Sequence, residues 1–288
     1  MKPLPLICFF LIISIYMISC CRFFSAEVFM KKLFVFDMDG TLLNKSGVIP
    51  DVIASFLNRL DHNEYGFTIA TGRSNNWTEP WLKSLNLRLP IISCGGACIK
   101  DLAGGQILFE SPMEIEVLES LARIARRHGV EGLTLVNPDE TAAEASISDR
   151  MEPYANGLHL AVLDDILSYE KTAVKMDMIG EMNVLSKVRK EIYNYVGRLS
   201  IYGQSWLEIT NSGVDKGSAL IKLGHLLGMD PAKMVVFGDD YNDLPMFTSA
   251  GTAVAMADSP EEVRISADLI VPANDEIELI KLTNSLLL

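Results

Sequence analysis

Cysteine is scarce in this chain, and the cysteines present do not form a pattern that binds metal or builds a disulfide scaffold. The 288 residues include five cysteines, and Cys8, Cys20 and Cys21 fall near the N-terminus. Cys94 and Cys98 are separated by Gly-Gly-Ala, which matches neither a redox Cys-x-x-Cys pair nor a zinc pair. We interpret these two as small buried thiols, the usual environment of free cysteine.

A surplus of positive charge is also lacking. The net charge is −12, from 25 Lys and Arg against 37 Asp and Glu, which argues against a surface that binds a phosphate backbone, so we expect no nucleic-acid partner. The four histidines have no spacing typical of metal ligands. A chain of 288 residues with 49% hydrophobic residues is long enough for one or two globular domains with a sizeable core.

One long hydrophobic run is present, at the N-terminus. Residues 4–21 are apolar apart from two serines, which fits a signal peptide, a membrane anchor or an upstream mis-start of translation. Met30 is a natural start for a soluble protein. We therefore predict a cytoplasmic protein, with a membrane-associated or exported form as the alternative, and expect membrane contact only if residues 4–21 are a genuine anchor. Residues 1–30 are left out of the fold prediction.

Two carboxylates follow the first short apolar run of the remaining chain. Residues 33–36 read Leu-Phe-Val-Phe, typical of a buried parallel strand, and are followed at once by Asp37 and Asp39. Gly40 and Thr41 are turn residues that end the strand. The carboxyl ends of strands are where open α/β sheets bind ligands. Desolvated carboxylates this close repel each other, so a cation or a shared proton is expected beside them.

The pattern along the rest of the chain predicts an α/β core interrupted by an α+β module. Short apolar strands alternate with helical patterns, which predicts a parallel sheet. These predicted strands cover residues 33–36, 67–70, 90–94, 234–237, 252–256 and 269–271. We assign residues 31–109 and 209–288 to the core and 110–208 to the inserted module.

Three details of the inserted module are also predicted. Ser111 is expected to cap a helix that has Pro112 at its first position. Val174, Met176 and Met178 alternate with charged residues, which predicts a half-exposed strand that carries Lys175 and Asp177 on its exposed side. A two-residue turn is expected at residues 203–204, between two strands.

Residue types suited to phosphoryl transfer follow several of these elements. An aspartate can attack phosphorus and form an acyl phosphate, and a second carboxyl group can protonate the leaving oxygen and later deprotonate water. Mg²⁺ prefers oxygen ligands, so two or three carboxylates suit it. A hydroxyl, an ammonium and backbone amides can stabilise phosphoryl oxygens. The residues that we expect to converge are Asp37, Asp39, Thr71, Gly72, Lys216, Asp239, Asn242 and Asp243.

Four motifs together closely resemble the haloacid dehalogenase superfamily, specifically its Cof-type hydrolases. The likeness covers residues 31–288. It rests on Asp37-Met38-Asp39-Gly40-Thr41, Ala70-Thr71-Gly72-Arg73, Gly213-Val214-Asp215-Lys216-Gly217 and Gly238-Asp239-Asp240-Tyr241-Asn242-Asp243. The resemblance implies a Rossmann-like parallel-sheet core whose inserted α+β module, residues 110–208, is a cap that selects the substrate.

The resemblance also implies roles for individual residues. Asp37 would be the nucleophile and Asp39 the general acid/base. Mg²⁺ would be held by Asp37, Asp239 and Asp243, together with the backbone carbonyl of Asp39. The phosphoryl oxygens would be bound by Met38 through its amide and by Thr71, Gly72, Lys216 and Asn242.

The implied activity is Mg²⁺-dependent hydrolysis of a small phosphorylated metabolite, such as a sugar phosphate, through an aspartyl-phosphate intermediate. Two alternatives stay open: a phosphomutase or phosphotransferase of the same fold, and a catalytically weak protein that binds phosphorylated metabolites. Where many relatives carry Asn-Gly-Ala, this chain has Gly95-Gly96-Ala97. The sequence predicts neither the oligomeric state nor the cap residues that contact the substrate.

Overall fold

The computed structural model describes residues 30–60, 64–155, 157–195, 199–202, 206–272 and 276–287. The predictions for residues 1–29 and for the turn at residues 203–204 therefore lie outside the described residues. In the described part, no helix combines the length and the apolar composition that crossing a bilayer requires.

A five-stranded parallel sheet forms the core, as the sequence predicts. Its spatial order is β14-β13-β12-β1-β2, and each neighbouring pair is parallel. The strands are β1 (Lys32–Phe36), β2 (Tyr65–Ile69), β12 (Met234–Gly238), β13 (Thr252–Met256) and β14 (Leu269–Val271). Strands β1 and β12 are neighbours at the centre, so residues that follow these two strands emerge side by side.

Helices cover both faces of this sheet, which explains why its central strands are continuously apolar. On one face Phe34 and Phe36 share a buried cluster with Leu57 and Leu279, which belong to α2 (Asp51–Asn58) and α10 (Glu276–Ser285). On the other face β1 shares a cluster with Leu220. The helices that follow the lysine motif and β12 are α7 (Lys216–Leu227) and α8 (Leu244–Ser249), and α9 (Glu261–Ile265) lies further along the chain.

A separate three-stranded sheet corrects one prediction. Residues 90–94 were predicted as a strand of the parallel sheet, but β3 (Ile91–Ser93) pairs antiparallel with β4 (Cys98–Lys100), which pairs with β5 (Ile107–Glu110). An isolated parallel bridge between Ala70 and Ile92 connects β3 to the chain just beyond β2. The chain reverses in the short turn at Cys94–Gly96, and this reversal brings β4 beside β3 before another crossover can form. The short helix α3 (Glu79–Leu82) precedes β3.

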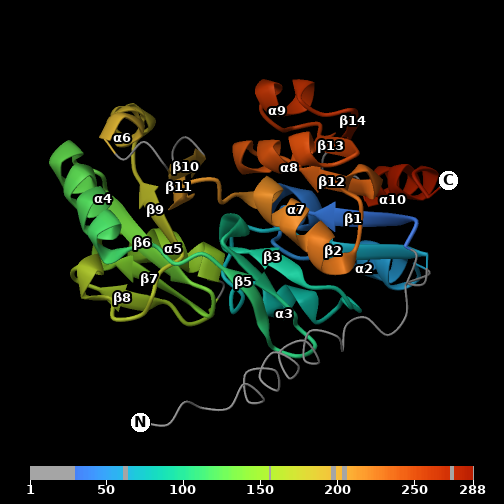
Figure 1. Cartoon of the computed structure of the whole chain (residues 1–288), viewed down its shortest axis with the longest axis horizontal. Helices are drawn as coiled ribbons and strands as arrows, with labels where there is room; N and C mark the ends of the chain where they lie inside the picture. Colours follow the sequence, from blue (N-terminus) through green and yellow to red (C-terminus); the bar gives the residue numbers. More distant parts are fainter. Residues whose placement is uncertain are drawn as a thin grey trace, which may run out of the picture.

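The inserted segment forms a six-stranded sheet backed by helices (Figure 1). Its order is β10-β11-β9-β6-β7-β8, and all its pairs are antiparallel except β7–β8. The strands are β6 (Gly132–Asn137), β7 (Glu140–Glu144), β8 (Ala161–Leu163), β9 (Lys175–Ile179), β10 (Leu199–Tyr202) and β11 (Trp206–Asn211). Strand β11 continues past residue 208, where we placed the end of the inserted module.

The two long helices of this segment pack on one face of its sheet. Helices α4 (Ile115–His128) and α6 (Met182–Tyr195) place Leu121 and Leu185 against Met176 and Met178 of β9. Helix α4 begins at Ile115, with Glu114 as its N-cap residue, so the prediction that Ser111 caps this helix is wrong. The other face of the sheet, near α5 (Ser148–Ala155), is turned toward the core.

Candidate active site

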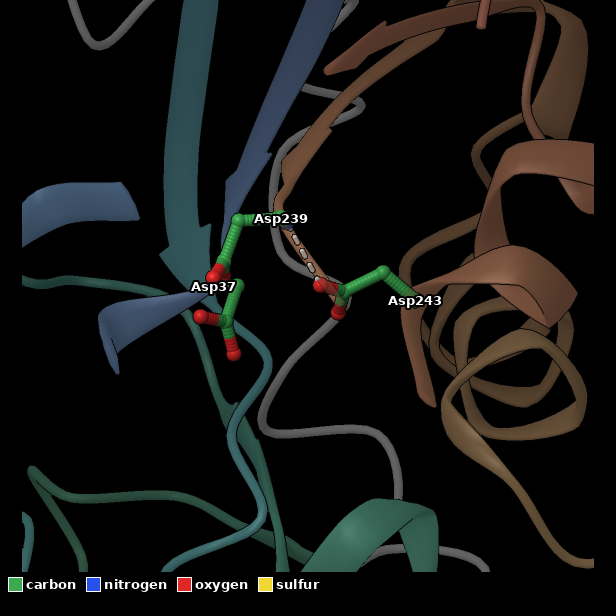
Figure 2. Close-up of side chains that lie close together, drawn as sticks. All are labelled: Asp37, Asp239 and Asp243. Carbon is green, nitrogen blue, oxygen red and sulfur yellow. Dashed lines mark hydrogen bonds between the residues drawn. The ribbon is translucent and has the colours of Figure 1, made fainter. Parts of the chain in front are cut away.

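Three carboxylates meet where β1 and β12 end. Asp37 directly follows β1 and Asp239 directly follows β12, and Asp243 ends the short helical turn Tyr241–Asp243 that comes next. One carboxylate oxygen from each residue lies within 4.8 Å of the others, and Figure 2 shows the three side chains gathered at this point. Asp37 and Asp243 are buried and Asp239 is half-buried. The predicted convergence of these three residues at one edge of the sheet is therefore observed.

Lys216 supplies the positive charge among them. Its side chain is 1% exposed, and its Nζ lies 2.6 Å from Asp37 Oδ1 and 2.6 Å from Asp243 Oδ1. It also donates to Asn242 Oδ1 at 3.4 Å. Lys216 is the first residue of α7, whose N-terminus is fixed by a capping box between Asp215 and Ser218. The capping box therefore fixes the start of α7, from which the Lys216 side chain extends to the carboxylates.

The carboxylates are held under electrostatic repulsion. Burial raises the pKa of Asp37 well above its usual value, and although Lys216 lowers it, Asp243 and Asp239 raise it further. Burial, followed by Asp243, raises the pKa of Asp239 to about 8. Burial alone would lower the pKa of Lys216, but Asp243 and Asp37 outweigh this effect, so its pKa lies above the usual value. These raised pKa values mean that the cluster retains protons when no cation is bound. Once all three acids ionise, three carboxylates against one ammonium leave two negative charges, and this all-oxygen donor set fits a hard divalent cation.

The glycine after the first motif allows the close approach of Asp239. Gly40 has a φ of +81°, and a Cβ atom there would lie 2.1 Å from Asp239 Oδ2, closer than any side chain can tolerate. The next residue, Thr41, donates a hydrogen bond from Oγ1 to Asp239 Oδ1 at 3.2 Å. The Asp-Gly-Thr turn thus both ends the strand and positions a carboxylate that is distant in sequence.

Asp39 lies apart from the carboxylate cluster. Its side chain is 49% exposed and accepts two hydrogen bonds from Arg73, from Nε at 2.7 Å and from Nη2 at 2.6 Å. The guanidinium carbon of Arg73 lies 4.5 Å from the centre of the Trp81 ring. This bidentate pair fixes the direction of the Asp39 carboxylate, beside the same cavity that Asp37 lines.

Some of the predicted phosphate-binding residues lie beside the carboxylate cluster. Thr71 is fully buried, its Oγ1 accepts a hydrogen bond from the Arg73 amide, and Gly72 and Asn242 line the cavity above Asp37. The side chain of Met38 is fully buried in the core, so any contact from this residue to a substrate would come from its backbone. Lys216 and Asn242 are brought together by the hydrogen bond described above.

A cavity of about 500 Å³ lies between the carboxylate-bearing edge of the core and the sheet of the inserted segment. The residues that this sheet contributes to the cavity were not found by sequence reasoning. Its lining residues include Asp37, Asp39, Gly72, Trp77, Arg150, Lys175, Asp177, Trp206, Glu208 and Asn242. Lys175 and Asp177 were predicted on the exposed side of a half-exposed strand, but both are 3% exposed. The alternation in β9 is real, with one face toward the helices and the other toward the core. Their charge was the only feature in the sequence that set these two residues apart.

Comparisons with known proteins identify the family to which the chain belongs and proteins with a similar fold. Residues 34–280 match the family model described as haloacid dehalogenase-like hydrolase. The chain is similar to the pyridoxal phosphate phosphatase YbhA of Escherichia coli, with 26% identity over 84% of this chain and 94% of the relative. A haloacid dehalogenase-like hydrolase from Bacteroides thetaiotaomicron aligns with a TM-score of 0.75 and 26% identity, over 88% of this chain and 98% of that one. A subclass IIB sugar phosphatase shares the fold, with a TM-score of 0.75, 21% identity and the same coverage.

Proposed function

Because the chain belongs to the haloacid dehalogenase-like hydrolase family and is a phosphatase of its Cof type, we propose that it hydrolyses a small phosphorylated metabolite through an aspartyl-phosphate on Asp37, with Mg²⁺ as cofactor. The observation that carries this proposal is the meeting of Asp37, Asp239 and Asp243 around Lys216. Of these four residues, only Asp239 and Asp243 are close to each other in sequence, so the convergence of all four is a property of the fold.

In the first half-reaction, a carboxylate oxygen of Asp37 attacks phosphorus, and the bond from phosphorus to the leaving oxygen breaks. Asp39 lies two residues further on at the cavity edge. Once protonated and released from its pair with Arg73, it donates this proton to the leaving oxygen. In the second half-reaction, Asp39 takes a proton from water, whose oxygen attacks phosphorus while the bond to Asp37 breaks. The products are an alcohol and inorganic phosphate, and both carboxyl groups return to their starting protonation states.

The remaining residues bind and orient the phosphoryl group. We assign this role to the Met38 amide, the Thr71 hydroxyl, the Gly72 amide, Lys216 and Asn242. Of these, Gly72 and Asn242 line the cavity with Asp37, and Lys216 contacts Asp37 directly. Asp37, Asp239, Asp243 and the Asp39 carbonyl would hold the metal ion, whose charge would offset repulsion between these acids and a dianionic substrate. Asp243 also accepts hydrogen bonds from the amides of Asp239 and Asp240, at 2.8 and 3.1 Å, which orients its carboxylate.

The cap cavity supports a polar, hydroxyl-rich leaving group. Its walls combine two tryptophans with charged side chains, and such a mixture can pack on a sugar ring while binding its hydroxyls. A sugar phosphate is therefore the first substrate to test, and pyridoxal phosphate, the substrate in the name of one relative, is the second.

The proposal is tested by assaying purified protein against a panel of phosphorylated metabolites, with Mg²⁺ and with a chelator. We expect Mg²⁺-dependent release of inorganic phosphate from at least one small monoester. Analysis of the organic product distinguishes hydrolysis from transfer, because a phosphomutase or phosphotransferase would yield a new phosphoester instead of free phosphate. Activity that persists undiminished in the chelator would contradict the metal assignment.

A further inference from the structure

A row of polar side chains crosses three neighbouring strands of the cap sheet and faces the catalytic core. Backbone register places Asp177 of β9 opposite Thr134 of β6 on one side and Glu208 of β11 on the other. Lys175 Nζ lies 3.0 Å from Asp177 Oδ1 and 3.0 Å from Glu208 Oε1, and Thr134 Oγ1 donates to Asp177 Oδ2 at 2.8 Å. Because residues two apart in a strand share a face, all four side chains lie on the face that lines the cavity.

Glu208 extends this row into the core. Its Oε2 accepts a hydrogen bond from Asn242 Nδ2 at 3.0 Å. On its other side, a Cβ atom added to Gly72 would lie 2.4 Å from Glu208 Oε1, so the carboxylate rests directly against the loop that follows β2. A carboxylate of the cap therefore touches two of the residues assigned to phosphate binding.

These contacts determine the orientation of the Asn242 amide. Its Oδ1 accepts from Lys216 Nζ at 3.4 Å, and one N–H of Nδ2 is directed to Glu208. The amide nitrogen carries two hydrogens, so the second N–H can donate to a phosphoryl oxygen. In the opposite orientation, the amide oxygen would face both the Glu208 carboxylate and the anionic phosphate, which is repulsive.

We propose that Glu208 is a positioning residue that fixes the Asn242 amide with its N–H groups toward the phosphate site, and that Lys175 neutralises the Glu208 carboxylate there. The inference rests on the proposed role of Asn242 in phosphate binding. Lys175 is required because an unpaired carboxylate beside the phosphate site would repel a dianion. Burial raises the pKa of Asp177. Burial is also the largest effect on Glu208, but Lys175, the hydrogen bond from Asn242 and Lys216 together outweigh it and lower the pKa of Glu208, in keeping with an ionised Glu208.

A double-mutant cycle tests this role with inorganic phosphate as the probe, because its binding does not depend on any leaving group. The affinity for phosphate is measured by calorimetry in Mg²⁺ for the wild type, Glu208→Ala, Asn242→Ala and the double variant. We expect each single variant to bind phosphate about tenfold more weakly, as expected for a lost hydrogen bond to a charged group. Since Glu208 acts through Asn242, the double variant should bind no more weakly than Asn242→Ala.

Two further variants distinguish positioning from a general effect on the cap. Glu208→Gln keeps an oxygen that can accept from Asn242 and should bind phosphate more tightly than Glu208→Ala; it replaces the alanine variant in the cycle if that variant fails to fold. Glu144→Gln is the matched control, because Glu144 is another carboxylate of the cap sheet that accepts from the Leu133 amide and Arg126 but does not line the cavity. Its phosphate affinity should equal that of the wild type.

The outcomes separate this inference from the proposed function. Equal weakening by Glu208→Ala in the presence and absence of Asn242, or no weakening at all, overturns the positioning role while hydrolysis by the wild type stands. A wild type that binds phosphate and follows the cycle but hydrolyses no monoester overturns the proposed function and leaves the positioning role intact. A wild type that binds no phosphate overturns both.

Discussion

Two buried lysines, one in the core and one in the cap, each lie between two carboxylates. Lys216 is 2.6 Å from both Asp37 and Asp243, and Lys175 is 3.0 Å from both Asp177 and Glu208. The side chains of the two lysines are 1% and 3% exposed. Asn242 connects the two clusters, because it accepts from Lys216 and donates to Glu208.

The clusters differ in how their remaining negative charge is balanced. In the core, a third carboxylate, that of Asp239, joins the pair, so three acids face one ammonium. In the cap, the two acids instead accept hydrogen bonds from neutral donors, Thr134 and Asn242. The core cluster therefore favours an additional cation. The cap cluster has one acid fewer and a neutral donor for each of its acids, although Asp177 Oδ1 contacts Lys175 without a hydrogen bond. On the proposed assignments, the same unit of one lysine and two carboxylates would serve chemistry in one place and positioning in the other.

Replacing one acid in each cluster, Asp37 in the core and Asp177 in the cap, should give the largest contrast in activity. Asp37→Asn keeps the size of the side chain but removes the nucleophile, so we expect turnover to fall by more than about 1,000-fold. Asp177→Asn should leave most of the turnover, because this carboxylate does not reach phosphorus. Steady-state release of phosphate checks both, with circular dichroism as the control for folding. Undiminished hydrolysis by Asp37→Asn would rule out the assigned nucleophile.

Removing each lysine should destabilise the protein to a similar extent but respond differently to Mg²⁺. Lys216→Met leaves the buried carboxylates of Asp37 and Asp243 without their cation, and Lys175→Met leaves those of the buried Asp177 and the half-buried Glu208 without theirs. Each loss costs about 3–5 kcal/mol of unfolding free energy. Added Mg²⁺ should restore part of the stability of Lys216→Met, since the metal would bind the same carboxylates, and little of that of Lys175→Met. Urea denaturation with Mg²⁺ and with a chelator measures this.

Equal recovery of the two lysine variants would contradict the contrast between the clusters. It would mean either that the cap cluster also binds the cation or that Mg²⁺ stabilises the protein by binding to other carboxylates on its surface. Lys281→Met provides the matched control, because this lysine forms an exposed pair with Glu278 on α10 and its removal should change stability little.

The third carboxylate of the core should control the response to metal more than the stability of the metal-free protein. Asp239→Asn removes one of three mutually repelling acids, so the variant should be at least as stable as the wild type in a chelator. Ligand binding to the folded state raises the melting temperature, and we expect the rise on addition of Mg²⁺ to be much smaller in the variant. Differential scanning calorimetry at both conditions checks this. A wild-type response in Asp239→Asn would exclude this residue as a ligand.

The core cluster could be predicted from the sequence because each of its members lies in a short motif at the end of a strand or the start of a helix. Asp37 and Asp239 follow apolar runs, and parallel strands deliver such residues to one edge. The parallel sheet itself was predicted for the same reason, apart from residues 90–94, where a local reversal gave antiparallel pairing.

The cap cluster was missed because an alternation of apolar and charged residues fits two environments: a strand whose polar face is in solvent, and a strand whose polar face is covered by another part of the protein. Alternation of Met176 and Met178 with Lys175 and Asp177 indicates two different faces of a strand, but not that the polar face is covered by a second module. That information lies in the contact between cap and core, which depends on residues such as Asn242 and Gly72 that are distant in sequence from β9. The periodicity of neighbouring residues cannot predict such a contact between distant segments.

Removing a neutral donor from the cap cluster should have the smallest effect. Thr134→Val keeps the shape of the side chain but removes the hydroxyl that donates to Asp177 Oδ2, and a lost buried hydrogen bond costs about 1–2 kcal/mol. Phosphate affinity should stay unchanged, because Lys175 still neutralises Glu208 and the Asn242 amide keeps its partner. Urea denaturation and phosphate calorimetry test the two halves of this expectation. If phosphate binding weakened as much as in Glu208→Ala, the whole cap row would position the phosphate site, and Glu208 would be only the member that touches it.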